Sequence, residues 1–500
     1  MRLIPRIDRD PRIVAFAQTP TGKAAALVVF AALLAPMRFG WFLEVLAVLI
    51  LMTLFPNRRR ILLSLGFVYF GLVHPIANRS HITAAVAKKE GLSNLNVPLV
   101  YRAVLFGTLA FLILWLWLVF SRSRGSSLPV KRPLLTLYLF HAALVLSAAL
   151  LPLSGLGRVL AWTFVAIFAG YLWYFSYALL DRNSPDRDPI RLQVGTLVPF
   201  WNFAGGGSTP YIKGAAYLRK TEAKSPEDLA VCQLKAIKLL AWSIVLLVTV
   251  QLFDLFVYGS ATTRASRLVV SLWNLGRVGP LPHLSVPSRE AVLDRSVIGQ
   301  PMAWYICWAS LIAAFLRNVL SITSGGGFLI AVCRMAGFRA LRVACRPLQA
   351  QTIADFWNRY NYYYKEMLVD FFFYPAFVRY FKRHPRLRVA AATFAAAGFG
   401  NMMAEFFRHT GSIIEIGLWR TVFGFRFFAF QALMLSTGIT ISQLRGRRRS
   451  PERSRAFGRQ FVSATGVAMF YCLLGVFDDA GKGYGLRDHS RFLFHLFGIG

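Results

Sequence analysis

Apolar segments long enough to cross a lipid bilayer recur along the whole chain, and they constrain its fold more than any other feature. A helix needs about 20 consecutive apolar residues to cross a hydrocarbon core about 30 Å thick. Only 16% of the residues are charged, against about 25% in a typical soluble protein, so polar side chains cannot cover this chain in water. Apolar runs lie near residues 23–36, 41–55, 61–77, 99–120, 134–151, 159–180, 232–258, 303–320, 387–407, 418–444 and 461–477. We therefore predict an all-α polytopic membrane protein with about eleven transmembrane helices.

The net charge of +35 is distributed in clusters between these runs. Arginines and lysines gather before the first run and near residues 58–60, 122–132, 182–191 and 445–459. If the N-terminus is cytoplasmic, every cluster lies on the cytoplasmic side, as the positive-inside rule requires. The pattern predicts a multi-pass protein of the inner (cytoplasmic) membrane, with residues 259–300 as a loop outside. Because the charges do not line one soluble face, the expected partner is the lipid bilayer and not nucleic acid.

Two segments after residue 180 are not typical of membrane-spanning helices. Residues 195–220 are apolar but interrupted by Pro199, Gly205–Gly207 and Pro210, which predicts a re-entrant segment surrounded by protein. Residues 321–365 combine a triple glycine at 325–327 with arginines and aromatic residues. That mixture suits short helices at the cytoplasmic interface.

Two polar residues near apolar segments are candidates for catalysis. His409 follows a predicted span, and an imidazole can take a proton from a hydroxyl because its ordinary pKa, about 6.5, is near neutral pH. Asn361 lies in an aromatic stretch and can hold a substrate by hydrogen bonds without becoming charged. A structural histidine is the alternative for His409. The five cysteines show no paired short spacing, so we predict no metal site.

An ordered series of residues in this region carries a resemblance to a known family. The series runs Gly337-Phe338-Arg339, Arg346-Pro347, Asp355-Phe356-Trp357-Asn358-Arg359-Tyr360-Asn361, Asp370 and Tyr374-Pro375. It resembles, without a gap over about forty residues, the bacterial branch of the membrane-bound O-acyltransferase (MBOAT) family, which includes alginate O-acetyltransferases and teichoic-acid D-alanyl transferases. Asn361 stands where bacterial members have histidine and where eukaryotic members have asparagine. The segment 321–327 lacks the two acidic residues that the family carries there.

The resemblance implies a fold, a reaction and roles for particular residues. Re-entrant and interfacial helices would surround a central tunnel, with N-terminal helices over 1–180, a catalytic core over 181–445 and a C-terminal part over 446–500. An acyl group would pass from a cytoplasmic acyl-CoA or acyl-carrier-protein thioester to a hydroxyl of a surface polysaccharide, lipid or secondary metabolite, with no bound cofactor. His409 would be the general base and Asn361 would orient the substrate or stabilise the oxyanion. The expected donor- or substrate-binding residues are Trp357, Arg359, Arg339, Arg346 and Asp355.

Three alternatives remain open at this point. The family histidine could instead be His384, although it lies in a solvated run of charges. Arg339 and Arg346 could be topological anchors and not donor contacts. The whole chain could be a transporter, a flippase or an acyltransferase-like subunit without activity. An extracytoplasmic acyltransferase partner is a further implication of the resemblance.

Overall fold

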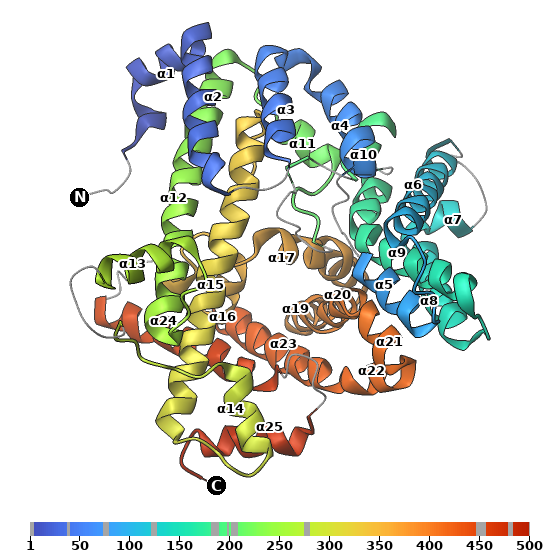
Figure 1. The fold of residues 1–500 in the computed structure, drawn as a ribbon, viewed down its shortest axis with the longest axis vertical. Helices are drawn as coiled ribbons and strands as arrows, with labels where there is room; N and C mark the ends of the chain where they lie inside the picture. The colour runs from blue at the N-terminus through green and yellow to red at the C-terminus, as the bar shows by residue number, and fades with distance from the viewer. Residues whose placement is uncertain are drawn as a thin grey trace. The chain divides into compact units, whose positions relative to one another are not determined.

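The computed structural model describes residues 5–37, 41–73, 80–121, 128–181, 190–197, 200–201, 209–274, 281–446, 457–478 and 484–499. Regular structure in these ranges is helical, with one antiparallel bridge between Glu222 and Phe338 (Figure 1). The predicted all-α class is therefore confirmed for the described residues. The centre of the predicted re-entrant segment, Pro199 and Gly205–Gly207, lies outside them.

The chain divides into two compact units that do not follow the order of the sequence. Unit 1 comprises Met1–Leu240, Leu329–Leu341 and Met403–Phe423, and unit 2 comprises Ala241–Phe328, Arg342–Met402 and Gly424–Gly500. Helices α12 (Pro226–Tyr258) and α15 (Trp304–Met335) contribute residues to both units. The division into N-terminal helices (1–180), a catalytic core (181–445) and a C-terminal part (446–500) stays a prediction.

The remaining helices lie wholly or mainly in one unit. In unit 1 they are α1 (Pro11–Gln18), α2 (Pro20–Leu34), α3 (Phe42–Leu54), α4 (Arg59–Val73), α5 (Ser80–Lys89), α6 (Val97–Ser121), α7 (Leu128–Lys131), α8 (Pro133–Leu150), α9 (Gly155–Asp181), α10 (Ile190–Gly195), α11 (Ala215–Thr221), α20 (Asn401–Arg408), α21 (Thr410–Ile416) and α22 (Leu418–Gly424). In unit 2 they are α13 (Arg264–Asn274), α14 (Arg289–Val297), α16 (Ile353–Arg359), α17 (Tyr362–Leu368), α18 (Tyr374–Arg379), α19 (Pro385–Thr393), α23 (Arg426–Gly446), α24 (Phe457–Leu474) and α25 (Leu486–His495).

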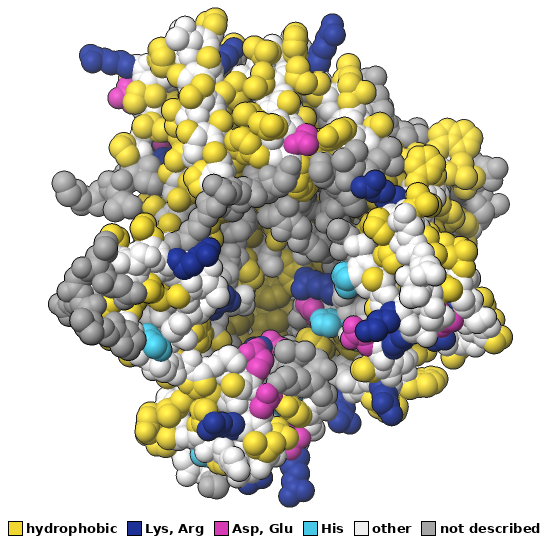
Figure 2. Space-filling model, viewed as in Figure 1, with side chains coloured by type: hydrophobic (Ala, Val, Ile, Leu, Met, Phe, Trp, Pro, Cys, Tyr) yellow, Lys and Arg dark blue, Asp and Glu magenta, His cyan; other side chains and the backbone are white. Residues whose placement is uncertain are grey.

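Seven of the described helical segments are long and apolar enough to cross a membrane. They are α6, α8, α9, α12, α15, the pair α22–α23 over Leu418–Arg445, and Gln460–Phe477. An eighth is possible if α1 and α2 form one span, although these helices are bent by 100° at the break before Pro20. Exposed apolar side chains such as Val28, Leu43 and Leu54 need lipid to cover them, and Figure 2 shows how widely such side chains are spread over the visible face. The chain is a helical, multi-pass membrane protein, and the higher total of about eleven spans stays a prediction.

The core of unit 1 is built around α9. In its most apolar 18-residue window, 83% of the residues are buried, against 39% for α6 and 28% for α8. A helix that is apolar on all sides is expected at the centre of a bundle. Val159, Trp162 and Val165 of α9 pack with residues of α5 and α8 and with Ile413 of α21. Helix α9 therefore fixes where the segment after His409 lies within this unit.

Two segments of unit 2 differ from the sequence prediction. Residues 259–300 are not simply a loop, because α13 and α14 form within them, and the Ser288 hydroxyl accepts a hydrogen bond from the Ala291 N–H to begin α14. Residues 321–335 are not short interfacial helices but the last part of α15, triple glycine included. The reason is packing. A Cβ at Gly326 would lie 2.5 Å from Cβ of Val343, so glycine lets these two segments of unit 2 approach closely.

Candidate active site

Residues 343–362, which hold the central part of the series that resembles the acyltransferase motif, lie in unit 2 and contain the short helix α16 between two backbone contacts. The Cys345 N–H donates to the Arg359 carbonyl at 2.8 Å, and the Tyr362 N–H donates to the Val343 carbonyl at 2.7 Å. Between them, the Thr352 hydroxyl accepts from the Asp355 N–H at 3.0 Å and begins α16. Residues 343–362 therefore form a closed loop whose two ends lie side by side.

Asn361 ends this loop in an unusual conformation. Its φ of +50° and ψ of 55° are in the left-handed region, where asparagine is among the more tolerated residues. The Asn361 carbonyl accepts from the Lys365 N–H at 3.0 Å and so helps to begin α17. Within the described part of the chain, its side-chain Oδ1 is buried and accepts no hydrogen bond. A buried amide oxygen of this kind is costly without a partner, so it is a natural contact for a ligand hydroxyl or N–H.

The other motif residues in unit 2 mainly hold the loop in place. Arg359 Nε lies 2.8 Å from Asp355 Oδ1, and both side chains are about one-third exposed. Asp355 also accepts from the Gln351 N–H at 3.3 Å, so it has two partners on its own loop. Trp357 packs against the buried residues Ala397, Leu435 and Ile439. These contacts favour positioning over direct chemistry for Asp355, Trp357 and Arg359.

The arginine series is divided between the two units. Arg339, in unit 1, pairs with Asp228 at 3.1 Å with a 45% exposed side chain. Arg334 donates to the Ala340 carbonyl from Nε and Nη2 at 2.9 and 2.7 Å, and so closes the end of α15. Arg346, in unit 2, has an exposed position and a φ of +50° before Pro347. The series therefore does not form one continuous basic stripe within either unit.

His409 lies in unit 1 where α20 ends and α21 begins. Its Nδ1 is 2.9 Å from the Glu405 carbonyl oxygen. A carbonyl oxygen only accepts, so Nδ1 carries the proton and Nε2 carries the lone pair of the neutral ring. The side chain is 36% exposed, and the Glu405 carboxylate, 3.9 Å away, already pairs with Arg408 at 2.8 Å. This tautomer is the one that a general base acting through Nε2 requires.

The surroundings of His409 connect it to the predicted re-entrant segment. Phe407, two residues earlier, is buried against His141 and Trp173, with ring centroids 4.9 and 5.6 Å apart. Tyr174 of α9 donates to the Thr209 carbonyl at 3.0 Å and holds the 195–220 segment. Within unit 1, neighbouring residues of α9 therefore contact both Phe407, through Trp173, and the end of the 195–220 segment, through Tyr174.

The candidates His384, His409 and Asn361 are divided between the two units. His384 is exposed in unit 2, directly before α19, as expected for a solvated residue. His409 belongs to unit 1 and Asn361 to unit 2, so their action as a catalytic pair stays a prediction. The described residues contain no group of three or more His, Cys, Asp or Glu side chains that could hold a metal ion.

Two features of the structure were not predicted from the sequence, a buried arginine and a polar cavity. One is Arg59, which is 2% exposed, donates from Nη1 to the Ala223 carbonyl at 3.3 Å, and leaves no room for a Cβ at Gly337. In the sequence, Arg59 is part of the basic cluster 58–60, and such a cluster is equally typical of a topological anchor. The other is a polar cavity in unit 2 that includes Phe356 and Tyr360 of the motif loop. Its charged residues are separated by up to 224 positions between Asp254 and Asp478, so no local pattern could reveal it.

No family model matches this chain, and no curated protein matches it significantly in sequence. The class that the fold itself defines is a helical multi-pass membrane protein.

Proposed function

We propose that this protein is a membrane-bound O-acyltransferase of the MBOAT type. It moves an acyl group from a cytoplasmic thioester, acyl-CoA or an acyl-carrier protein, to a hydroxyl acceptor. The observation that carries the proposal is the gap-free series of residues from Gly337 to Pro375. In its mechanism Nε2 of His409 takes the acceptor proton as the oxygen attacks the thioester carbonyl, and the thiolate leaves. About eleven spans would surround the tunnel in which this occurs.

Two local geometries support the assignment of roles. The hydrogen bond from Nδ1 of His409 to the Glu405 carbonyl favours the tautomer with a basic Nε2. The buried Oδ1 of Asn361 is suited to orient an acceptor hydroxyl, and its amide N–H₂ group to stabilise an oxyanion. Asp355, Trp357 and Arg359 keep the motif loop in shape. Arg346 is a better candidate than Arg339 for binding an anionic donor, because Arg339 already pairs with Asp228.

The direct test is a comparison of cells with and without the gene by mass spectrometry. Envelope polysaccharide, lipid and small secreted products are analysed separately, so that a difference identifies both the acyl group and the acceptor. We expect an acyl mass to disappear from one of these fractions, and to return with the wild-type gene. Unchanged acylation in all three would contradict the proposal.

The proposed orientation places the N-terminus and the basic clusters in the cytoplasm, with residues 259–300 outside. Cys345 is the one exposed cysteine in the described part of the chain, so Cys345→Ser is the background for labelling. In that background, Ser285→Cys is expected to react with a membrane-impermeant maleimide in intact cells. Ser126→Cys is expected to react only after the membrane is opened. If both react from outside, the orientation is wrong.

A further inference from the structure

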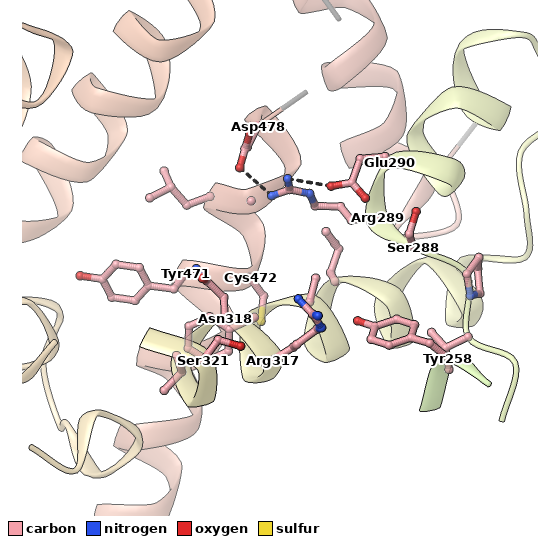
Figure 3. A pocket seen from close by; sticks show the side chains of 18 of the residues that line it. Tyr258, Ser288, Arg289, Glu290, Arg317, Asn318, Ser321, Tyr471, Cys472 and Asp478 are labelled. Carbon is pink, nitrogen blue, oxygen red and sulfur yellow. Dashed lines mark hydrogen bonds and ion pairs between the residues drawn. The ribbon is translucent and has the colours of Figure 1, made fainter. Parts of the chain in front are cut away.

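A polar cavity is present in unit 2, whereas His409 belongs to unit 1. It is a cavity of about 970 Å³, formed by the end of α12, the segment 285–290, the middle of α15, α16 and the end of α24. Binding pockets for small molecules usually measure about 300–1,000 Å³, so this one has room for a ligand the size of a disaccharide. Figure 3 shows side chains from these separate segments facing the same space.

The charged groups of the cavity are arranged in pairs. Arg317 binds Asp254 through two hydrogen bonds, Nε to Oδ1 at 2.6 Å and Nη2 to Oδ2 at 2.9 Å. Arg289 lies between Asp478 and Glu290, at 2.8 and 3.2 Å (Figure 3). The lining thus holds three carboxylates against two guanidinium groups, one negative charge in excess. That balance does not favour an anion, although the chain as a whole carries +35.

The negative charge of Glu290 is favoured by its own contacts. Burial of the Glu290 carboxyl opposes its charge, but backbone N–H groups and the neighbouring Arg289 lower its pKa overall. The Arg289 side chain is 18% exposed, whereas those of Glu290 and Asp478 are 40% and 36% exposed. The two carboxylates are therefore more accessible to a ligand than the guanidinium that holds them. Oxygens fixed in this way are strong acceptors for hydroxyl groups.

The rest of the lining supplies neutral hydrogen-bonding groups and aromatic rings. Within the described ranges, the Asn318 carboxamide and the Ser321 hydroxyl of α15 have no protein hydrogen-bond partner, and both line the cavity. Phe315, Phe356 and Tyr471 form an aromatic wall, with Phe356 and Tyr471 centroids 4.1 Å apart. Rings offer a flat apolar surface beside the polar groups. An acyl chain would not need so many polar groups, and an anion would need surplus positive charge.

We propose that this cavity binds a neutral polyhydroxylated ligand of one or two sugar rings. Its hydroxyls donate to the carboxylates of Glu290 and Asp478 and exchange hydrogen bonds with Asn318 and Ser321. Its apolar ring face packs against Phe315, Phe356 or Tyr471. The site does not depend on acyl transfer, and its test uses no acyl donor.

The test is saturation-transfer NMR on the purified full-length protein in lipid nanodiscs. The probes are glucose, N-acetylglucosamine and maltose, with glucuronate and hexanoate as anionic and acyl comparisons. We expect at least one neutral sugar to bind, glucuronate to bind more weakly than glucose, and hexanoate to leave sugar binding unchanged. No signal from any neutral sugar at millimolar concentration, stronger binding of glucuronate, or displacement of the sugar by hexanoate would each overturn the proposal.

Variants then locate the binding within the molecule. Asn318→Ala with Ser321→Ala removes groups that make no protein hydrogen bond, so the fold is preserved, and sugar binding should weaken roughly 3–10-fold. Gln300→Ala is the matched control, because that exposed side chain lies outside the cavity. Equal affinity of the double variant and the control, with both melting as the wild type does, would place the sugar elsewhere and refute this site. Acyl transfer that persists without sugar binding would leave the proposed function intact.

Discussion

Replacing His409 with alanine is expected to slow acyl transfer roughly 10²–10⁴-fold, the usual contribution of a positioned general base. The loss should fall on kcat, because a base acts in the transition state and not in donor binding. Protein yield and melting temperature should stay near wild type, since the side chain is 36% exposed and its Nδ1 lies 2.9 Å from the carbonyl oxygen of Glu405, only four residues earlier. The measurement is the initial rate of the purified protein at saturating donor.

Two further variants make this result specific. His384→Ala should be nearly silent, because that side chain is exposed in a run of charges. Asn361→Ala should be severe, since one hydrogen-bond donor to an oxyanion is worth about 3 kcal/mol in such a site. If the wild type acylates a hydroxyl and His409→Ala does so equally well, the mechanism is wrong. The resemblance would then indicate the fold alone.

Gly326→Ala is expected to lower the melting temperature in detergent and reduce the yield of folded protein. The new methyl group would lie 2.5–2.7 Å from Cβ, Cγ2 and Cγ1 of Val343, and side-chain rotation does not move Cβ away. Overpacking of this kind typically costs about 1–3 kcal/mol, and here it acts where α15 meets the motif loop. Thermal unfolding followed by intrinsic fluorescence measures the effect.

The neighbouring residue provides the control. A Cβ at Gly325 meets nothing within 4 Å, so Gly325→Ala should be neutral or stabilise the helix by about 0.5–1 kcal/mol. Val343→Gly combined with Gly326→Ala should be less destabilised than the sum of the two single variants, because the clash is removed. Equal melting temperatures for Gly325→Ala and Gly326→Ala would show that the two segments do not pack as described. Equal melting temperatures would instead favour a flexible role for the triple glycine.

Hydropathy was sufficient to predict the class of fold. Long apolar runs such as 99–120 and 159–180 became α6 and α9, because a bilayer or a bundle centre both select continuous apolar helices. The same signal could not tell a lipid-facing span from a buried one. Only the packing shows that α9 is mostly buried and α8 mostly not.

Local rules failed where packing outweighed them. Glycine disfavours a helix, and residues 321–365 were predicted to form short interfacial helices, yet the long helix α15 continues through Gly325–Gly327. The close approach of Val343 explains why a residue without a side chain is needed at 326. Likewise, the polar character of 259–300 concealed α13 and α14.

The sequence by itself determined that the chain enters a membrane, because apolar runs of sufficient length are enough for that, and it supplied the candidate residues for the acyl transfer that we propose. The tertiary structure decided how those residues can act. It supplied the tautomer of His409 through the Glu405 carbonyl, the left-handed backbone of Asn361, and the pairing of Arg339 with Asp228. It also assembled Asp254, Arg289, Arg317 and Asp478 around one cavity. Such features depend on contacts between distant segments, and those contacts exist only after the helices have packed.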